Sequence, residues 1–139
     1  MTQAFKHPLL QGHPALINLP SQLLERVHAE GQLRRYSLGQ PLIFANQLPS
    51  DVLLILEGQA RLLAREGDRW LTVNKFGPGN WVGLASLLRV GGCEEVSAAE
   101  PLLALALPDR LALSLVSERT FYQAACAEVL DAELLALLM

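Results

Sequence analysis

Short apolar runs separated by turn residues fill the stretch from residue 32 to residue 107. Runs of this length, with glycine, proline, asparagine and aspartate between them, are typical of an antiparallel β-sandwich or barrel. The tripeptide Glu66-Gly67-Asp68 is predicted as a hairpin tip, because glycine adopts a positive φ without a steric penalty. The predicted strands are Leu33–Ser37, Leu42–Phe44, Val52–Glu57, Ala60–Arg65, Trp70–Lys75, Glu95–Ala98 and Leu102–Leu107.

Helical periodicity flanks the predicted strands on both sides. A first helix is predicted to begin at Pro20-Ser21, with Ser21 as its N-cap, and to end at Gly31. Beyond the strands, Pro108 suits the N-terminus of a second helix, in which Leu111, Leu115 and Val116 fall on one face. Ser117 is predicted as the N-cap of a longer, very apolar helix that follows it, with Phe121, Tyr122, Ala125, Val129 and Leu130 at helical spacing.

The chain is therefore predicted to be a mainly β fold of the double-stranded β-helix or jelly-roll type with flanking α-helices. Its 139 residues suffice for one domain, assigned to 20–139. Residues 1–19 are expected to be irregular, because Pro8, Gly12 and Pro14 interrupt them. The apolar residues 134–139 suggest that the chain is the front part of a longer protein.

Composition and charge remove several classes of function. The net charge is −3, and the only adjacent basic pair is Arg34-Arg35, so direct DNA binding by this chain is not expected. No apolar stretch reaches the ~18 residues that a membrane span needs, so no membrane contact is expected. Two distant cysteines, Cys93 and Cys126, without a secretory leader predict reduced thiols in a cytoplasmic protein.

No constellation of catalytic or metal-ligating residues stands out. The histidines His7, His13 and His28 all precede the predicted strands, whereas a metal-dependent cupin carries its histidines on the strands. There is also no phosphate loop of the GxxxxGK[ST] type. Neither an enzyme nor a metal site is expected, and a cupin-like enzyme is the least favoured of three hypotheses.

Ordered glycine motifs then narrow the fold. The sequence contains Tyr36-Ser37-Leu38-Gly39-Gln40, a run from Ser50 to Leu62 around Glu57-Gly58, and Phe76-Gly77-Pro78-Gly79-Asn80-Trp81-Val82-Gly83. With these gaps and flanking helices, residues 16–138 resemble a cyclic nucleotide-binding domain of the catabolite-activator and kinase-regulatory-subunit type. The resemblance implies a β-roll whose mouth holds a phosphate-binding cassette that begins at Gly83.

In that family a cassette glutamate binds the ribose 2′-hydroxyl and a cassette arginine pairs with the cyclic phosphate. Here the cassette runs from Gly83 to Val96 and keeps Gly83, Ser86 and Leu87 of the family frame. Leu84 stands at the position of the glutamate, and Gly91-Gly92 stands where proline and arginine are expected.

The loss of these two side chains weakens the expected ligand binding. A charge-assisted hydrogen bond contributes roughly 1.5–3 kcal/mol, so both losses together reduce affinity on the order of 100-fold or more. Glu94 and Glu95 add negative charge where a phosphate would bind. Binding of cAMP or cGMP is therefore possible but disfavoured, and no other cofactor is expected.

Two functions remain open. The first is a non-catalytic regulatory or docking domain that acts through its C-terminal helix, as a homodimer or on an effector domain of a transporter, channel or transcription regulator. The second is a sensor that binds a cyclic nucleotide or another anion through backbone amides, Ser86 and Arg89. The candidate ligand-binding residues of this cassette are Gly83, Leu84, Ala85, Ser86, Arg89, Gly92 and Cys93.

Three of these candidates also have a purely structural interpretation. Leu84 either lines an apolar pocket suited to an apolar or planar ligand such as haem or a fatty acid or, as we favour, belongs to the core of a pocket that has collapsed. Arg89 either replaces the missing arginine or, as is more common for arginine, lies exposed. Cys93 is interpreted as an unreactive thiol, because glutamates rather than cations follow it.

Overall fold

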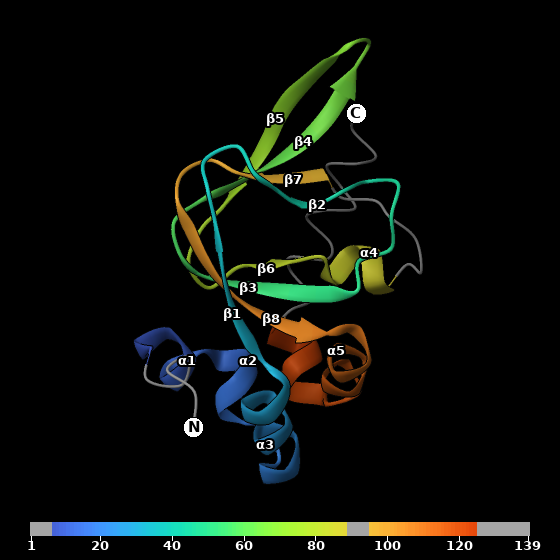
Figure 1. The fold of residues 1–139 in the computed structure, drawn as a ribbon. Coiled ribbons are helices and arrows are strands. Elements are labelled where there is room, and N and C mark those ends of the chain that lie inside the picture. The colour runs from blue at the N-terminus through green and yellow to red at the C-terminus, as the bar shows by residue number, and fades with distance from the viewer. Residues whose placement is uncertain (1–6, 89–94, 125–139) are drawn as a thin grey trace.

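The computed structural model describes residues 7–88 and 95–124. Two four-stranded antiparallel sheets face each other, and helices cover the outer side of one sheet (Figure 1). The helix-covered sheet has the strand order β1-β8-β3-β6, and the other has the order β2-β7-β4-β5. The predicted fold class, mainly β with flanking helices, is confirmed.

Every predicted strand is present, and no strand end moves by more than one residue. The strands are β1 (Gln32–Tyr36), β2 (Pro41–Ile43), β3 (Asp51–Glu57), β4 (Ala60–Glu66), β5 (Arg69–Phe76), β7 (Glu95–Ala98) and β8 (Leu102–Pro108). An additional strand, β6 (Trp81–Val82), pairs with β3 through Leu53 and Val82. No strand was predicted there, because two residues are too few to give an alternating pattern.

The N-terminal residues are helical, so the prediction of an irregular segment is wrong. Helices α1 (Pro8–Gly12) and α2 (Pro14–Ile17) each begin with a proline, whose fixed φ suits the first helical position. The residue before each proline is a histidine that caps the helix. Nδ1 of His7 accepts from the Leu9 N–H at 3.2 Å, and Nδ1 of His13 accepts from the Ala15 N–H at 3.0 Å.

Helix α3 (Ser21–Glu30) spans the predicted range and ends at Gly31. Its N-cap is Pro20 without a side-chain hydrogen bond, so the prediction of Ser21 as the cap is wrong. Ser21 lies one residue inside the helix.

Two further helices follow the sequence pattern. Helix α4 (Leu84–Leu88) lies directly after β6, and α5 (Asp109–Val116) follows Pro108 with Leu111 and Leu115 fully buried. The next helix begins at residue 119, so Ser117 does not flank it as the predicted N-cap. The Ser117 hydroxyl donates to the Ser114 carbonyl oxygen at 2.6 Å. Residues 119–124 are helical, and the rest of the predicted C-terminal helix lies outside the described residues.

The molecule has two cores, and β3 and β8 contribute to both. The side chains of Leu103, Leu105 and Leu107 pack beneath the helices, together with alternate residues of β3. Ala104 and Ala106 point the other way, into the space between the two sheets. This alternation follows from the pleat of a strand.

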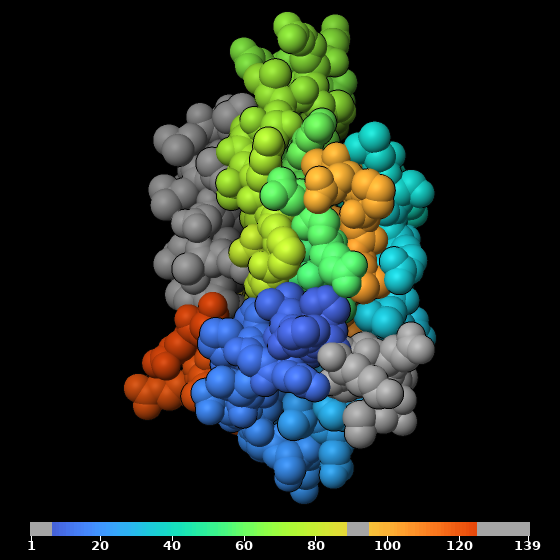
Figure 2. All heavy atoms as spheres, turned by 90° about the vertical axis from the view of Figure 1, so that its left-hand side faces the viewer, coloured from blue at the N-terminus to red at the C-terminus, as the bar shows by residue number. Residues whose placement is uncertain are grey.

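The β4–β5 hairpin turns at Gly67, whose φ is +62°, as predicted for this tip. Figure 2 shows the hairpin projecting from the end of the molecule opposite to the N-terminal helices.

Gly58, which connects β3 to β4, provides a test of the roll's tightest turn. Its φ is +87°, and an added Cβ would overlap the Pro101 carbonyl oxygen and lie 2.9 Å from Cα of Leu102. Gly58→Ala is expected to lower the free energy of unfolding by about 2–5 kcal/mol, because backbone overlap adds to the left-handed penalty. Gly67→Ala, with φ +62° and nothing within 4 Å, should lose only about 1–2 kcal/mol.

Denaturant unfolding of the two variants measures this difference. Equal losses for Gly58→Ala and Gly67→Ala would contradict the close approach at Gly58.

Candidate functional site

The predicted cassette begins at a backbone position that requires glycine. Gly83 joins β6 to α4 with φ +94°, a conformation that residues with a Cβ rarely adopt. Its carbonyl oxygen accepts a hydrogen bond from the Leu87 N–H at 3.0 Å, which closes the turn of α4.

The cassette side chains from Leu84 to Leu87 are buried. Leu84 is 2% exposed and packs in the core between the sheet and the helices. Ala85 is buried, and Ser86 is fully buried and has a partner of its own. The candidates Arg89, Gly92 and Cys93, with Gly91 and Glu94, lie outside the described residues.

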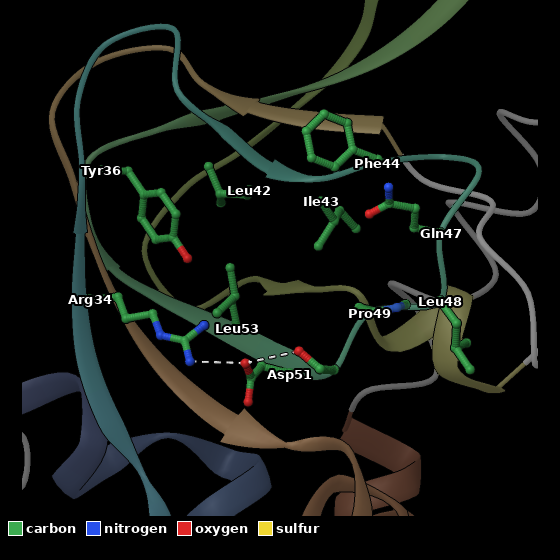
Figure 3. Close-up of a pocket in the computed structure, with 11 residues that line it drawn as sticks. Arg34, Tyr36, Leu42, Ile43, Phe44, Gln47, Leu48, Pro49, Asp51 and Leu53 are labelled. Atoms are coloured by element: carbon green, nitrogen blue, oxygen red, sulfur yellow. Dashed lines mark hydrogen bonds and ion pairs between the residues drawn. The ribbon is translucent and has the colours of Figure 1, made fainter.

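The space between the sheets contains a pocket of about 250 Å³ (Figure 3). Strands β1, β2 and β3 and the loop 44–50 line it. Its apolar wall includes Leu42, Ile43 and Leu53, which belong to or pack against the core of the roll. Leu84 does not line this pocket, so the roll keeps a cavity even though Leu84 is core.

An ion pair crosses the polar side of the pocket. Nη2 of Arg34 lies 2.9 Å from Oδ2 of Asp51, and the Tyr36 hydroxyl points toward them in Figure 3. Partial burial by itself lowers the pKa of Arg34. The hydrogen bond and charge of Asp51, and more weakly those of Tyr36, outweigh this effect and hold the pKa above its ordinary value. The guanidinium is therefore a permanent cation inside the roll.

The pocket adjoins the start of the cassette. A Cβ built on Gly83 would lie 3.4 Å from the Asp51 carbonyl oxygen and 3.6 Å from the Pro49 side chain. Both of these residues line the pocket. On the other side, the Glu95 carboxylate accepts from the Ala45 N–H at 2.8 Å and ties β7 to the loop.

A chain of ring contacts connects the cassette to the helices. Nε2 of His13 donates to the Gly79 carbonyl oxygen at 2.9 Å, and the His13 ring meets Trp81 edge-on with centroids 5.7 Å apart. Trp81 in turn meets Phe121 edge-on at 5.2 Å, and Phe121 is fully buried. Because Trp81 stands two residues before Gly83, the first turn of the C-terminal helical segment packs directly on the strand that leads into the cassette.

A family model for the cyclic nucleotide-binding domain matches residues 33–119. The chain belongs to the cyclic nucleotide-binding domain family. No curated protein sequence matches this chain significantly.

Solved structures show the same fold. The catabolite activator protein of Thermus thermophilus is 26% identical, with a TM-score of 0.66 over 87% of this chain and 58% of that protein. The sensor domain of the transcriptional regulator DNR from Pseudomonas aeruginosa is 15% identical, with a TM-score of 0.74 over 95% of this chain and 90% of that domain. The regulatory subunit of a cAMP-independent protein kinase A from Trypanosoma cruzi, bound to guanosine, is 17% identical, with a TM-score of 0.68 over 91% of this chain and 50% of that subunit. The chain thus spans 58% of the length of the first of these proteins and 50% of the length of the third.

Within the described residues of this family member, no three histidine, cysteine, aspartate or glutamate side chains lie close enough together to hold a metal ion. The described helices include none with the length and apolar character of a membrane span.

The sequence analysis missed the polar group in the roll. Arg34 and Tyr36 are two residues apart on a predicted strand, and Asp51 directly precedes another predicted strand. Their spacing puts Arg34 and Tyr36 on one face of β1, which was a usable signal for a polar site. The pairing of this face with Asp51 depends on the strand order β1-β8-β3, which local patterns do not encode.

The Arg34–Asp51 pair is expected to contribute little to stability. The Arg34 side chain is 40% exposed, and solvent screens such pairs to about 0–1 kcal/mol. In urea unfolding, the free energy of unfolding of Arg34→Met should therefore lie within about 1 kcal/mol of the wild-type value. The same is expected of Arg35→Met, which lies on the opposite face of β1. A loss of several kcal/mol for Arg34→Met alone would mean that the pair is desolvated and structural.

Phe121 is expected to be one of the costliest side chains to remove. Phe121→Ala should lower the free energy of unfolding by about 3–5 kcal/mol, because it leaves a cavity beside Trp81. Tyr122→Ala is the matched control, since Tyr122 is 50% exposed and should cost about 0.5 kcal/mol or less. Similar losses for both variants in denaturant unfolding would contradict the packing of Phe121.

Proposed function

We propose that this domain is a non-catalytic regulatory module that does not bind cAMP or cGMP in the manner usual for its family. The burial of Leu84 is the observation that carries this proposal. Leu84 stands where the resemblance puts a ribose-binding glutamate, and its 2% exposed side chain packs in the helix-side core. An aliphatic side chain accepts no hydrogen bond, so the ribose hydroxyl would lose its charged partner.

The C-terminal helical segment is the proposed output. The contact between Trp81 and Phe121 supports this role, because a shift of β6 or of the cassette would move the surface on which that segment packs. We propose that the segment joins a second copy of the chain or an effector domain. The proposed location is the cytoplasm, and no DNA contact by this chain is proposed.

Regulatory function without cAMP has a structural precedent among the proteins of this fold. The Trypanosoma cruzi protein is the regulatory subunit of a cAMP-independent protein kinase A, and its structure was solved with guanosine bound. This supports the proposal that a roll of this family can regulate without a cyclic phosphate.

The second candidate is an anion sensor that uses backbone amides, Ser86 and Arg89. The pocket beside Gly83 favours it, because the interior of the roll is open enough for a small ligand. A thermal shift with cAMP that disappears in Arg89→Ala would establish this candidate in place of the first.

Thermal denaturation with millimolar cAMP tests the first candidate. A ligand present at about 100 times its Kd adds about 2.7 kcal/mol, which raises the Tm of a domain of this size by several degrees. We expect no rise with cAMP, while a cAMP-binding member of the family measured alongside should show one. A rise of several degrees with cAMP would refute the proposal.

A further inference from the structure

The Arg34–Asp51 pair gives the pocket an unusual electrostatic character. The two side chains enter the roll from β1 and β3, which lie on either side of β8 in the sheet. Arg34 is in register with Ala104 of β8, and Asp51 is in register with Pro108, so the two side chains approach each other diagonally across β8. The β8 residues on this interior face, Ala104 and Ala106, are small and leave room for the guanidinium to cross the strand.

The charges of this pair cancel, which disfavours a simple ion as the occupant. An anion would have to compete with Asp51 at 2.9 Å from the guanidinium, and a cation would meet the charge of Arg34. An uncharged ligand avoids both costs and brings no charge of its own to be desolvated.

Hydrogen-bonding capacity remains on both partners. A guanidinium has five N–H donors and a carboxylate about four acceptor sites, whereas the ion pair between these residues uses one nitrogen and one oxygen. A ligand with an acceptor beside a donor on one planar edge complements the two together. Guanine has this edge: arginine donates to its O6 and N7, and a carboxylate accepts from its N1–H and amino group.

The rest of the pocket suits a planar body of about this size. The volume of about 250 Å³ lies just below the usual range for sites of drug-sized molecules, roughly 300–1,000 Å³. Leu42, Ile43 and Leu53 form an apolar wall, and the aromatic rings of Tyr36 and Phe44 offer faces for stacking. Phe44 is 44% exposed, so part of its ring is accessible.

We propose that this pocket binds an uncharged purine through its base, with Arg34 and Asp51 as the groups that recognise a guanine-type edge. The inference rests on the proposed function, in which the cassette does not bind a cyclic phosphate in the usual manner. The pocket is in direct contact with the start of the cassette, since Asp51 and Pro49 lie against Gly83. Ligand at Arg34 and Asp51 would hold β1 and β3 in place beside that glycine.

Isothermal titration of the whole chain with guanosine tests the proposal. We expect saturable binding of guanosine, and binding at least about tenfold weaker of unsubstituted purine riboside, which has no donor on its base. Asp51→Asn and Arg34→Met should each weaken guanosine binding at least about tenfold. Asp51→Asn keeps a side-chain oxygen that can accept a hydrogen bond from Arg34. Arg35→Met is the control, because it removes an arginine charge from the other face of β1, and it should bind guanosine as wild type does.

Each other result would overturn the inference. Guanosine binding that survives both Arg34→Met and Asp51→Asn would put the ligand elsewhere. Tighter binding of a zwitterion, such as free leucine, than of guanosine would show that the proposed class of ligand, an uncharged purine, is wrong. Absence of guanosine, cAMP and cGMP binding would refute this inference alone, whereas binding of cAMP or cGMP without guanosine would refute the proposed function as well. Circular dichroism of each variant distinguishes lost binding from lost folding.

Discussion

Strand β8 is buried on both faces, and the layers of the molecule are organised around it. Its leucines at 103, 105 and 107 bury one side under the helices, while Ala104 and Ala106 face the interior of the roll. Fully burying a leucine contributes roughly 1.5–3 kcal/mol, so the helix-facing side supplies much of the stability. The alanine side contributes less burial, and it is this side that borders the space where Arg34 reaches Asp51.

The same arrangement is compatible with the change in ligand chemistry that we propose. Leu84 packs in the helix-side core. Gly83 keeps the positive-φ backbone of the turn that begins the cassette. Trp81 anchors that turn to Phe121, and His13 ties the preceding loop at Gly79 to the N-terminal helices. The mechanical connection between cassette and helices therefore does not depend on a phosphate.

Local patterns predicted most of this fold and less of the site. The strands and α3 were recognisable because period-two alternation and glycine punctuation are properties of neighbouring residues. The helices at Pro8 and Pro14 were missed because proline was interpreted as an interruption rather than a first helical residue. β6 was missed because its two residues take their strand geometry from pairing with β3.

The site shows the same division. Gly83 was identified from a motif, and the burial of Leu84 fits its apolar character. The pairing of Arg34 with Asp51 and of Trp81 with Phe121 joins residues that are far apart in the chain. Such pairs depend on the order of strands in the sheet and on how helices pack against it, and local sequence patterns do not reveal either.

Phe121 packs on Trp81 across the helix-side core and is expected to hold β6 and the cassette helix in place. Hydrogen–deuterium exchange of Phe121→Ala, compared with Tyr122→Ala, measures this effect. We predict faster exchange at residues 81–88 in Phe121→Ala, beyond any change in the distant β4–β5 hairpin, and wild-type exchange at residues 81–88 in Tyr122→Ala. Exchange at residues 81–88 that rises no more than in the hairpin would contradict this role of Phe121.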